Sequence, residues 1–174
     1  MKRILIALLT LCAVPAAAQA NAAQANTAVG SVRPLYGQVA AFVLAAAEQM
    51  PEAEYGFKPT PDVRSFGQLV GHIANAQHMI CAMAMGEQSQ GGRNWEQVTE
   101  KAALVAALRA SNQACERAYQ QSDASALQSG TLFGRETTRL GMLVLNVSHD
   151  FEHYGNMVTY LRIKGMVPPS SQGN

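Results

Sequence analysis

The amino-acid sequence predicts an all-α fold, a single four-helix bundle. Four long stretches carry apolar residues at steps of three and four, the spacing that places side chains on one face of an α-helix. Proline, glycine or serine stands at most of their ends, and no segment between them alternates convincingly as a β-strand does. Connectors of moderate length between such helices are typical of bundles, whose sites form from inward side chains of facing helices.

The first twenty residues have the pattern of a secretory signal peptide. Lys2 and Arg3 give a basic start, residues 4–14 are apolar, and Ala18 and Ala20 form an A-x-A cleavage site. The apolar run is too short for a comfortable membrane span. We therefore expect cleavage after residue 20 and export to the periplasm or the medium.

The chain that remains after cleavage is expected to form one domain. Residues 21–31 lack large apolar side chains and predict a flexible leader, residues 32–169 predict the bundle, and residues 170–174 predict a disordered tail. Without Lys2 and Arg3, eleven basic residues stand against twelve acidic ones. This balance argues against nucleic-acid binding, which needs a basic face. The sequence has no second long apolar run, so no membrane span is expected after the signal peptide.

The first helix is expected from Pro34 to Met50, because proline suits a first helical turn and Pro51 cannot continue a helix. Its inward face is expected to consist of Leu35, Val39, Phe42, Val43, Ala46 and Met50. An ordered connector follows.

The second helix opens at Ser65, which forms a capping-box pattern with Gln68. Its inward side is expected to carry Phe66, Leu69, Val70, Ile73, Gln77 and Ile80.

The third and fourth helices complete the bundle. The third is expected at residues 98–121, after a loop at 86–94, and the fourth at residues 137–164, after a polar stretch. Gly165 suits the end of the fourth helix, and the prolines after it prevent continuation. The core stripe of the fourth helix reads Met142, Leu145, His149, His153, Asn156 and Tyr160.

Two histidines therefore stand where a bundle expects leucine or isoleucine. His149 and His153 are four residues apart, so their imidazoles lie one above the other and can bind the same metal ion. Unpaired burial of these polar groups would cost several kcal/mol. His72 on the second helix is a candidate third ligand if the second and fourth helices are neighbours. A single such histidine is more often a hydrogen-bonded core residue.

Three neutral imidazoles leave a coordination position open, as in catalytic zinc sites. The same ligands suit nickel and iron, so the sequence predicts one divalent transition metal without fixing its identity. A metal in such a site activates water as a nucleophile or base. Asn156 and Tyr160 are expected to line the pocket, and Glu152 is a candidate base, although a solvated helix residue is the simpler interpretation.

Two alternatives remain open. His149, Glu152 and His153 match the H-x-x-E-H pattern of inverted zinc peptidases, but no acidic residue follows Glu152 to complete that ligand set. An exported copper-binding protein is the other alternative, because soft ligands gather near the end of the second helix. These are His78, Met79, Cys81, Met83 and Met85. Methionines at helical spacing are more often core filling, and His78 is more simply a surface residue.

Cys81 and Cys115 are candidates for a disulfide, since an exported chain meets an oxidising compartment. The competing interpretation is two small buried apolar side chains. The geometry that a disulfide needs cannot be judged from the sequence.

Three segments carry a resemblance to a known family. Residues 64–74 around His72, residues 149–156 and residues 160–169 resemble, in this order, the motifs of the DinB family, over essentially the whole domain from about residue 32 to 169. The resemblance implies a four-helix bundle, often dimeric, in which three histidines hold a divalent metal. Many members carry histidine and glutamine where this chain has Glu152 and Asn156.

The matching ligand positions are His72, His149 and His153, the same three that the helical pattern selects. Some members of the family are thiol-dependent transferases or isomerases. The resemblance thus implies hydrolytic or transfer chemistry on a small molecule, at a metal-activated water or thiol. A protein that kept the three histidines for ligand binding without catalysis is the remaining interpretation.

Overall fold

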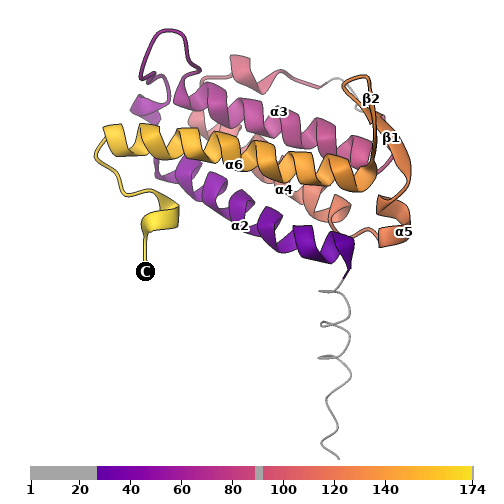
Figure 1. The fold of residues 1–174 in the computed structure, drawn as a ribbon. Helices are drawn as coiled ribbons and strands as arrows, with labels where there is room; N and C mark the ends of the chain where they lie inside the picture. The colour runs from indigo at the N-terminus through magenta and orange to yellow at the C-terminus, as the bar shows by residue number, and fades with distance from the viewer. Residues whose placement is uncertain (1–26, 89–91, 174) are drawn as a thin grey trace, which may run out of the picture.

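Four long helices form the bundle in the computed structural model, which describes residues 27–88 and 92–173. They are α2 (Ala28–Gln49), α3 (Phe66–Ala84), α4 (Lys101–Ala118) and α6 (Arg139–Ile163). Helix α3 lies beside both α4 and α6, and α2 packs along α6 (Figure 1). The expected all-α bundle is confirmed. The expected signal peptide at residues 1–20 lies outside the described residues.

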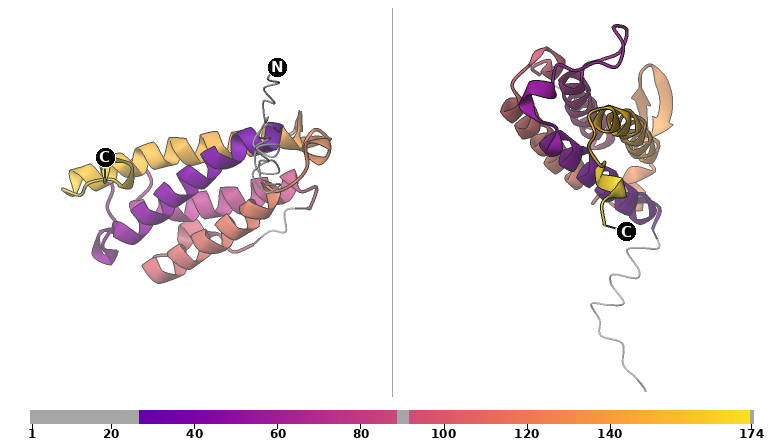
Figure 2. Two further views of the ribbon diagram at one scale, coloured as in Figure 1. Left: turned by 90° about the horizontal axis from the view of Figure 1, so that it is seen from below. Right: turned by 90° about the vertical axis from the view of Figure 1, so that its left-hand side faces the viewer.

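Short elements connect the long helices. A 3₁₀ turn η1 (Glu52–Glu54) precedes α3, and η2 (Trp95–Gln97) precedes α4. Helix α5 (Asp123–Ala126) and a β-hairpin follow α4, and η3 (Pro169–Ser171) closes the chain. The hairpin stands at one end of the bundle, while the connector before α3 and the C-terminal turn lie at the other (Figures 1 and 2).

The first helix begins earlier than the sequence predicts. Thr27 accepts the Gly30 N–H as the N-cap, and the Asp123 carboxylate accepts the N–H groups of Ala28 and Val29. These contacts satisfy N–H groups that a helix start leaves unpaired. Residues 28–31 are therefore helical rather than part of a flexible leader, and Pro34 lies inside the helix rather than in its first turn.

The expected inward face of α2 is confirmed at Val39, Val43, Ala46 and Met50, but not at Leu35. Leu35 is 48% exposed, whereas its neighbour Tyr36 is buried and stacks on Tyr119. On α6, Leu145 is 39% exposed. Both departures occur because aromatic or polar side chains occupy the adjacent core positions. By length and apolarity α2 would suit a membrane span, but within the described residues its buried side packs on α6 as a core helix does.

The capping box at the start of α3 is confirmed, since Ser65 and Gln68 bond each other's backbone N–H groups. Gly165 ends α6 with a φ of +74°, the left-handed conformation expected of it. The tail differs from the prediction. Residues 169–171 form η3, and the Ser170 N–H donates to the Tyr154 hydroxyl at 2.8 Å.

The polar stretch before α6 contains a hairpin that the sequence does not predict. Strands β1 (Ser129–Leu132) and β2 (Arg135–Thr138) pair antiparallel through a two-residue turn. Both turn residues, Phe133 and Gly134, have positive φ, as a type I′ turn requires. Strands of four residues are too short to show an alternating pattern, and phenylalanine is an uncommon turn residue.

Cys81 on α3 and Cys115 on α4 form a disulfide, with Cα atoms 5.1 Å apart. Both sulfur-bearing side chains are buried between the two helices. The two helices are thus joined covalently near their C-terminal ends. The alternative of two free buried thiols is wrong.

Candidate metal centre

Three histidines converge where α3 lies beside α6. His149 and His153 stand one turn apart on α6, and His72 reaches them from α3. The His149 Nε2 atom lies 3.2 Å from His72 Nε2 and 3.0 Å from His153 Nε2. His153 is only 7% exposed, and the other two are half-buried. The structure thus brings together the three residues that the sequence selects.

The spacing of the three nitrogens fits a shared cation. Imidazole nitrogens bind zinc at about 2.0–2.1 Å, which places neighbouring ligand nitrogens roughly 3.0–3.4 Å apart in tetrahedral or octahedral geometry. The separations of 3.0 and 3.2 Å fall in this range. Lone pairs on facing nitrogens repel each other, and a cation between them removes the repulsion. The residues present therefore suit a divalent metal.

Glu96 fixes the orientation of His72. Its Oε1 atom lies 2.7 Å from His72 Nδ1, and its Oε2 atom accepts the Arg64 Nε–H at 2.9 Å. A carboxylate accepts the Nδ1 proton, so the Nε2 lone pair of His72 faces the other two histidines. Burial raises the pKa of Glu96, but the bonds from Arg64 and His72 outweigh it and hold that pKa below its ordinary value. Sequence reasoning missed Glu96, which lies 24 residues from His72 with no pattern linking them.

Two of the three histidines are held in the neutral form that binds metals. Burial, followed by the neighbouring His149 and His72, lowers the pKa of His153 to about 4. Burial also lowers the pKa of His72, although the bond to Glu96 opposes this. Both imidazoles are neutral at pH 7, so their lone pairs are free for a cation.

The close approach of η2 to α3 depends on Gly71. A Cβ atom at this position would lie 2.5 Å from the Trp95 carbonyl carbon and 2.8 Å from the Glu96 nitrogen. Real Cβ atoms essentially never approach backbone so closely. The missing side chain therefore lets Glu96 lie against the helix that carries His72.

Replacing Gly71 with alanine is expected to push η2 away from α3. Overpacking of this kind costs about 1–3 kcal/mol, and loss of the Glu96 contact is expected to weaken zinc binding roughly 10-fold. Thermal denaturation and calorimetric zinc titration would measure the two effects. Gly37→Ala is the matched control, because nothing lies within 4 Å of its added Cβ. Equal behaviour of the two variants would contradict the role of Gly71.

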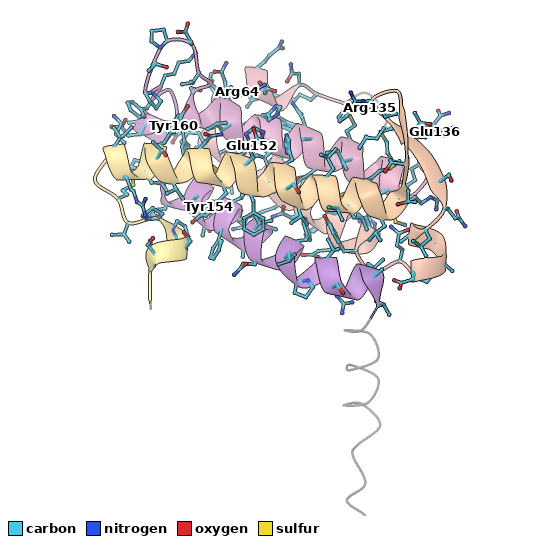
Figure 3. The ribbon with its side chains drawn as sticks, in the orientation of Figure 1. Arg64, Arg135, Glu136, Glu152, Tyr154 and Tyr160 are labelled. Atoms are coloured by element: carbon cyan, nitrogen blue, oxygen red, sulfur yellow. A yellow bond between two sulfur atoms is a disulfide. The ribbon has the colours of Figure 1, made fainter. Side chains whose placement is uncertain are left out.

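A surface pocket of about 780 Å³ opens beside the histidines. His153, Glu152, Asn156 and Tyr160 line it together with Glu96, Arg64 and the connector before α3. Figure 3 places Arg64, Glu152 and Tyr160 in this region. Glu152 and Asn156 are exposed at the pocket. Tyr160 is buried, and its hydroxyl donates to the Arg64 carbonyl at 2.6 Å, so this tyrosine anchors the pocket wall.

The soft ligands at the end of α3 do not form one site. Cys81 is bonded to Cys115 in a disulfide, so it has no free thiolate to bind Cu(I). This argues against the copper-binding alternative. Met79, Met83 and Met85 pack against the core around Ile80. His78 is exposed, as expected of a surface residue. Within residues 27–88 and 92–173, the cluster of potential metal ligands is His72, His149 and His153.

Comparisons with known proteins show which sequences and folds this chain resembles. The sequence profile of the DinB superfamily matches residues 36–157. The uncharacterized protein YjoA of Bacillus subtilis strain 168 is 25% identical over 122 residues, which cover 68% of this chain and 79% of YjoA. Its crystal structure superposes with a TM-score of 0.65 at 18% identity, covering 79% and 93% of the two chains.

A DinB-like protein from Bacillus cereus ATCC 10987 gives the same TM-score of 0.65 at 18% identity. That likeness covers 75% of this chain and 89% of the other. At such identities the two superpositions establish the fold.

Proposed function

Because this chain belongs to the DinB superfamily, we propose that it is a metalloprotein that binds one divalent transition metal through His72, His149 and His153. The observation that carries the proposal is the convergence of three imidazole Nε2 atoms at 3.0 and 3.2 Å. Zinc, nickel and iron all suit this ligand set. When bound, such a metal supplies a Lewis-acid centre that activates water or a thiol.

The reaction that we propose is hydrolysis or group transfer on a small molecule. The pocket of about 780 Å³ beside His153 has the size of a small-molecule site. Glu152 is exposed there and would accept a proton from a reacting group, while Asn156 would donate hydrogen bonds to the substrate. Tyr160 would act by holding the segment at Arg64 in place.

We further propose that the protein acts outside the cytoplasm. The disulfide between Cys81 and Cys115 supports this, because such bonds persist in oxidising compartments. The signal-peptide pattern of residues 1–20 supports it independently. Assembly as a homodimer stays a prediction from the family resemblance.

Metal analysis of the purified protein tests the proposed site. We expect close to one metal ion per chain in the wild type, and less than roughly a tenth of that in His149→Ala and His153→Ala, since two imidazoles hold a divalent ion weakly. His78→Ala is the matched control, because His78 is an exposed histidine on α3. Equal metal content in all four proteins would refute the site.

A screen of the metal-loaded protein against esters, amides and thiol adducts tests the reaction. Turnover that a chelator abolishes and metal restores would support catalysis. Stoichiometric metal without turnover of any of these classes would favour a ligand-binding role for the same site.

A further inference from the structure

Asp150 lies directly behind the metal centre and is completely buried. It follows His149 on α6, and its exposed fraction is 0%. An isolated buried carboxylate is costly, so its two oxygens need partners. Burial raises the pKa of Asp150, and the neighbouring His149 and Gln77 oppose the rise. The contacts of the two oxygens differ sharply, which points to a function for one of them.

Gln77 on α3 holds the Oδ2 atom of Asp150 from behind, with its Nε2 donating at 2.9 Å. On its other side, Gln77 Oε1 accepts from the Ser111 hydroxyl of α4 at 2.7 Å. This is the shorter of two contacts of that hydroxyl, the other being the Leu108 carbonyl at 2.9 Å. Gln77 therefore presents N–H to Asp150.

Asn146, one turn before Asp150, donates to the same oxygen. Its Nδ2 lies 3.3 Å from Asp150 Oδ2 and 3.2 Å from the Tyr119 hydroxyl. Tyr119 donates its proton to the Leu143 carbonyl at 2.8 Å, so its oxygen must accept from Asn146. A second amide is thus fixed as a donor toward Oδ2.

The other carboxylate oxygen faces the metal centre. Oδ1 of Asp150 lies 3.7 Å from Nδ1 of His149. Both atoms are buried, and neither has a hydrogen-bond partner among the described residues. The unpaired oxygen of Asp150 and the Nδ1 atom of His149, which points away from the metal position, therefore face each other. A small rotation of the imidazole would bring the two atoms within hydrogen-bond distance.

We infer that Asp150 is a positioning residue whose Oδ1 accepts the Nδ1–H of His149 in the metal-bound protein, so that the ring keeps its Nε2 lone pair on the metal. This inference rests on the proposed metal site. Glu96 holds His72 in the same way from the solvent side. The three-helix network through Gln77, Asn146 and Ser111 thereby links the packing of α3, α4 and α6 to the direction of one ligand.

Asp150→Asn tests the inference. The amides of Gln77 and Asn146 would face the new carbonyl oxygen, so the new NH₂ group would face His149 Nδ1 as a donor. Metal binding through Nε2 would then place two donors against each other. We expect zinc affinity, measured by calorimetry with a competing chelator, to fall about 10–100-fold. Glu136→Gln, which removes the same charge from an exposed strand position, should bind zinc as the wild type does.

Melting of each protein with chelator separates positioning from stability. A purely structural role for Asp150 would lower the melting temperature of the metal-free protein and leave the zinc affinity of the folded variant within twofold of the wild type. That result would overturn the inference while leaving the metal site intact. A wild type that binds no zinc would refute the proposed function itself.

Proton NMR of zinc-loaded wild type covers the case in which Asp150→Asn does not fold. The His149 Nδ1–H should resonate further downfield and exchange more slowly than the His153 Nδ1–H. His153 serves as the internal control, because its buried Nδ1 has no hydrogen-bond partner among the described residues. Signals that do not differ in this way would overturn the inference without any variant.

Discussion

Replacing both Cys81 and Cys115 with alanine is expected to lower the free energy of unfolding by about 3–4 kcal/mol. The bond closes a loop between residues 34 positions apart, and the chain-entropy model assigns this amount to a loop of that length. For a chain of this size the melting temperature should fall by roughly 10 °C. Both side chains are buried, so the substitutions also remove a little packing.

Reduction of the wild type separates the bond from the packing. Wild type melted with a strong reductant should approach the double variant, whereas the reductant should leave the double variant unchanged. Oxidised and reduced wild type that melt within about 2 °C of each other would show that the cross-link contributes little. The reduced protein should also bind zinc more weakly. Cys81 lies one helical turn after Gln77, and Cys115 lies one turn after Ser111, so the disulfide holds together the two helices that carry the hydrogen bonds behind Asp150.

Zinc is expected to raise the melting temperature of the wild type by about 5–10 °C when its free concentration is a hundred times the dissociation constant. A ligand bound to the folded state alone contributes about 2.7 kcal/mol under that condition. His72→Ala should show almost no shift, because the remaining pair lies on one helix and no longer joins α6 to α3.

Controls make this second result specific. Chelator should return the wild type to the melting temperature of the metal-free protein, and His78→Ala should keep the full shift. A similar rise in His72→Ala would mean that zinc binds elsewhere or through the two histidines of α6 alone. Calcium, which prefers oxygen ligands, should leave all three proteins unchanged.

The helical period was sufficient to find the histidine pair of the candidate metal centre. His149 and His153 interrupt the predicted stripe, of which Met142, His153 and Tyr160 are buried. The buried face of α6 is centred one position away, on residues such as Asp150, Tyr154 and Met157. His72 needed the further assumption that the second and fourth helices are neighbours, which the packing of α3 on α6 confirms. Local patterns report which face of a helix is buried, and paired ligands one turn apart are visible in them.

The residues that support the ligands could not be found in this way. Glu96 reaches His72 through a 3₁₀ turn whose position depends on the backbone approach at Gly71. Asp150 was visible in the sequence only as the residue after His149, and its carboxylate is held by amides of Gln77 on α3 and Asn146 on α6. Such contacts are set by tertiary packing, for which a single sequence carries no periodic signal.

The departures in the fold have similar causes. The start of α2 depends on Asp123, a residue nearly a hundred positions later in the chain. The hairpin depends on two positive φ angles at Phe133 and Gly134. Neither a distant cap nor a turn with an unusual first residue leaves a local pattern.

The separation of His72 from His149 by 77 residues has a consequence for how the protein would obtain the proposed metal. An unfolded chain offers only the adjacent pair on α6, so the complete ligand set first exists after α3 and α6 have met. The metal that binds is then determined in the compartment where the chain folds. For three imidazole ligands, the ion that binds depends largely on which ions are available there. A protein that crosses a membrane before folding would thus take its metal from the destination compartment, whereas the same polypeptide folding in the cytosol would select among the ions present there.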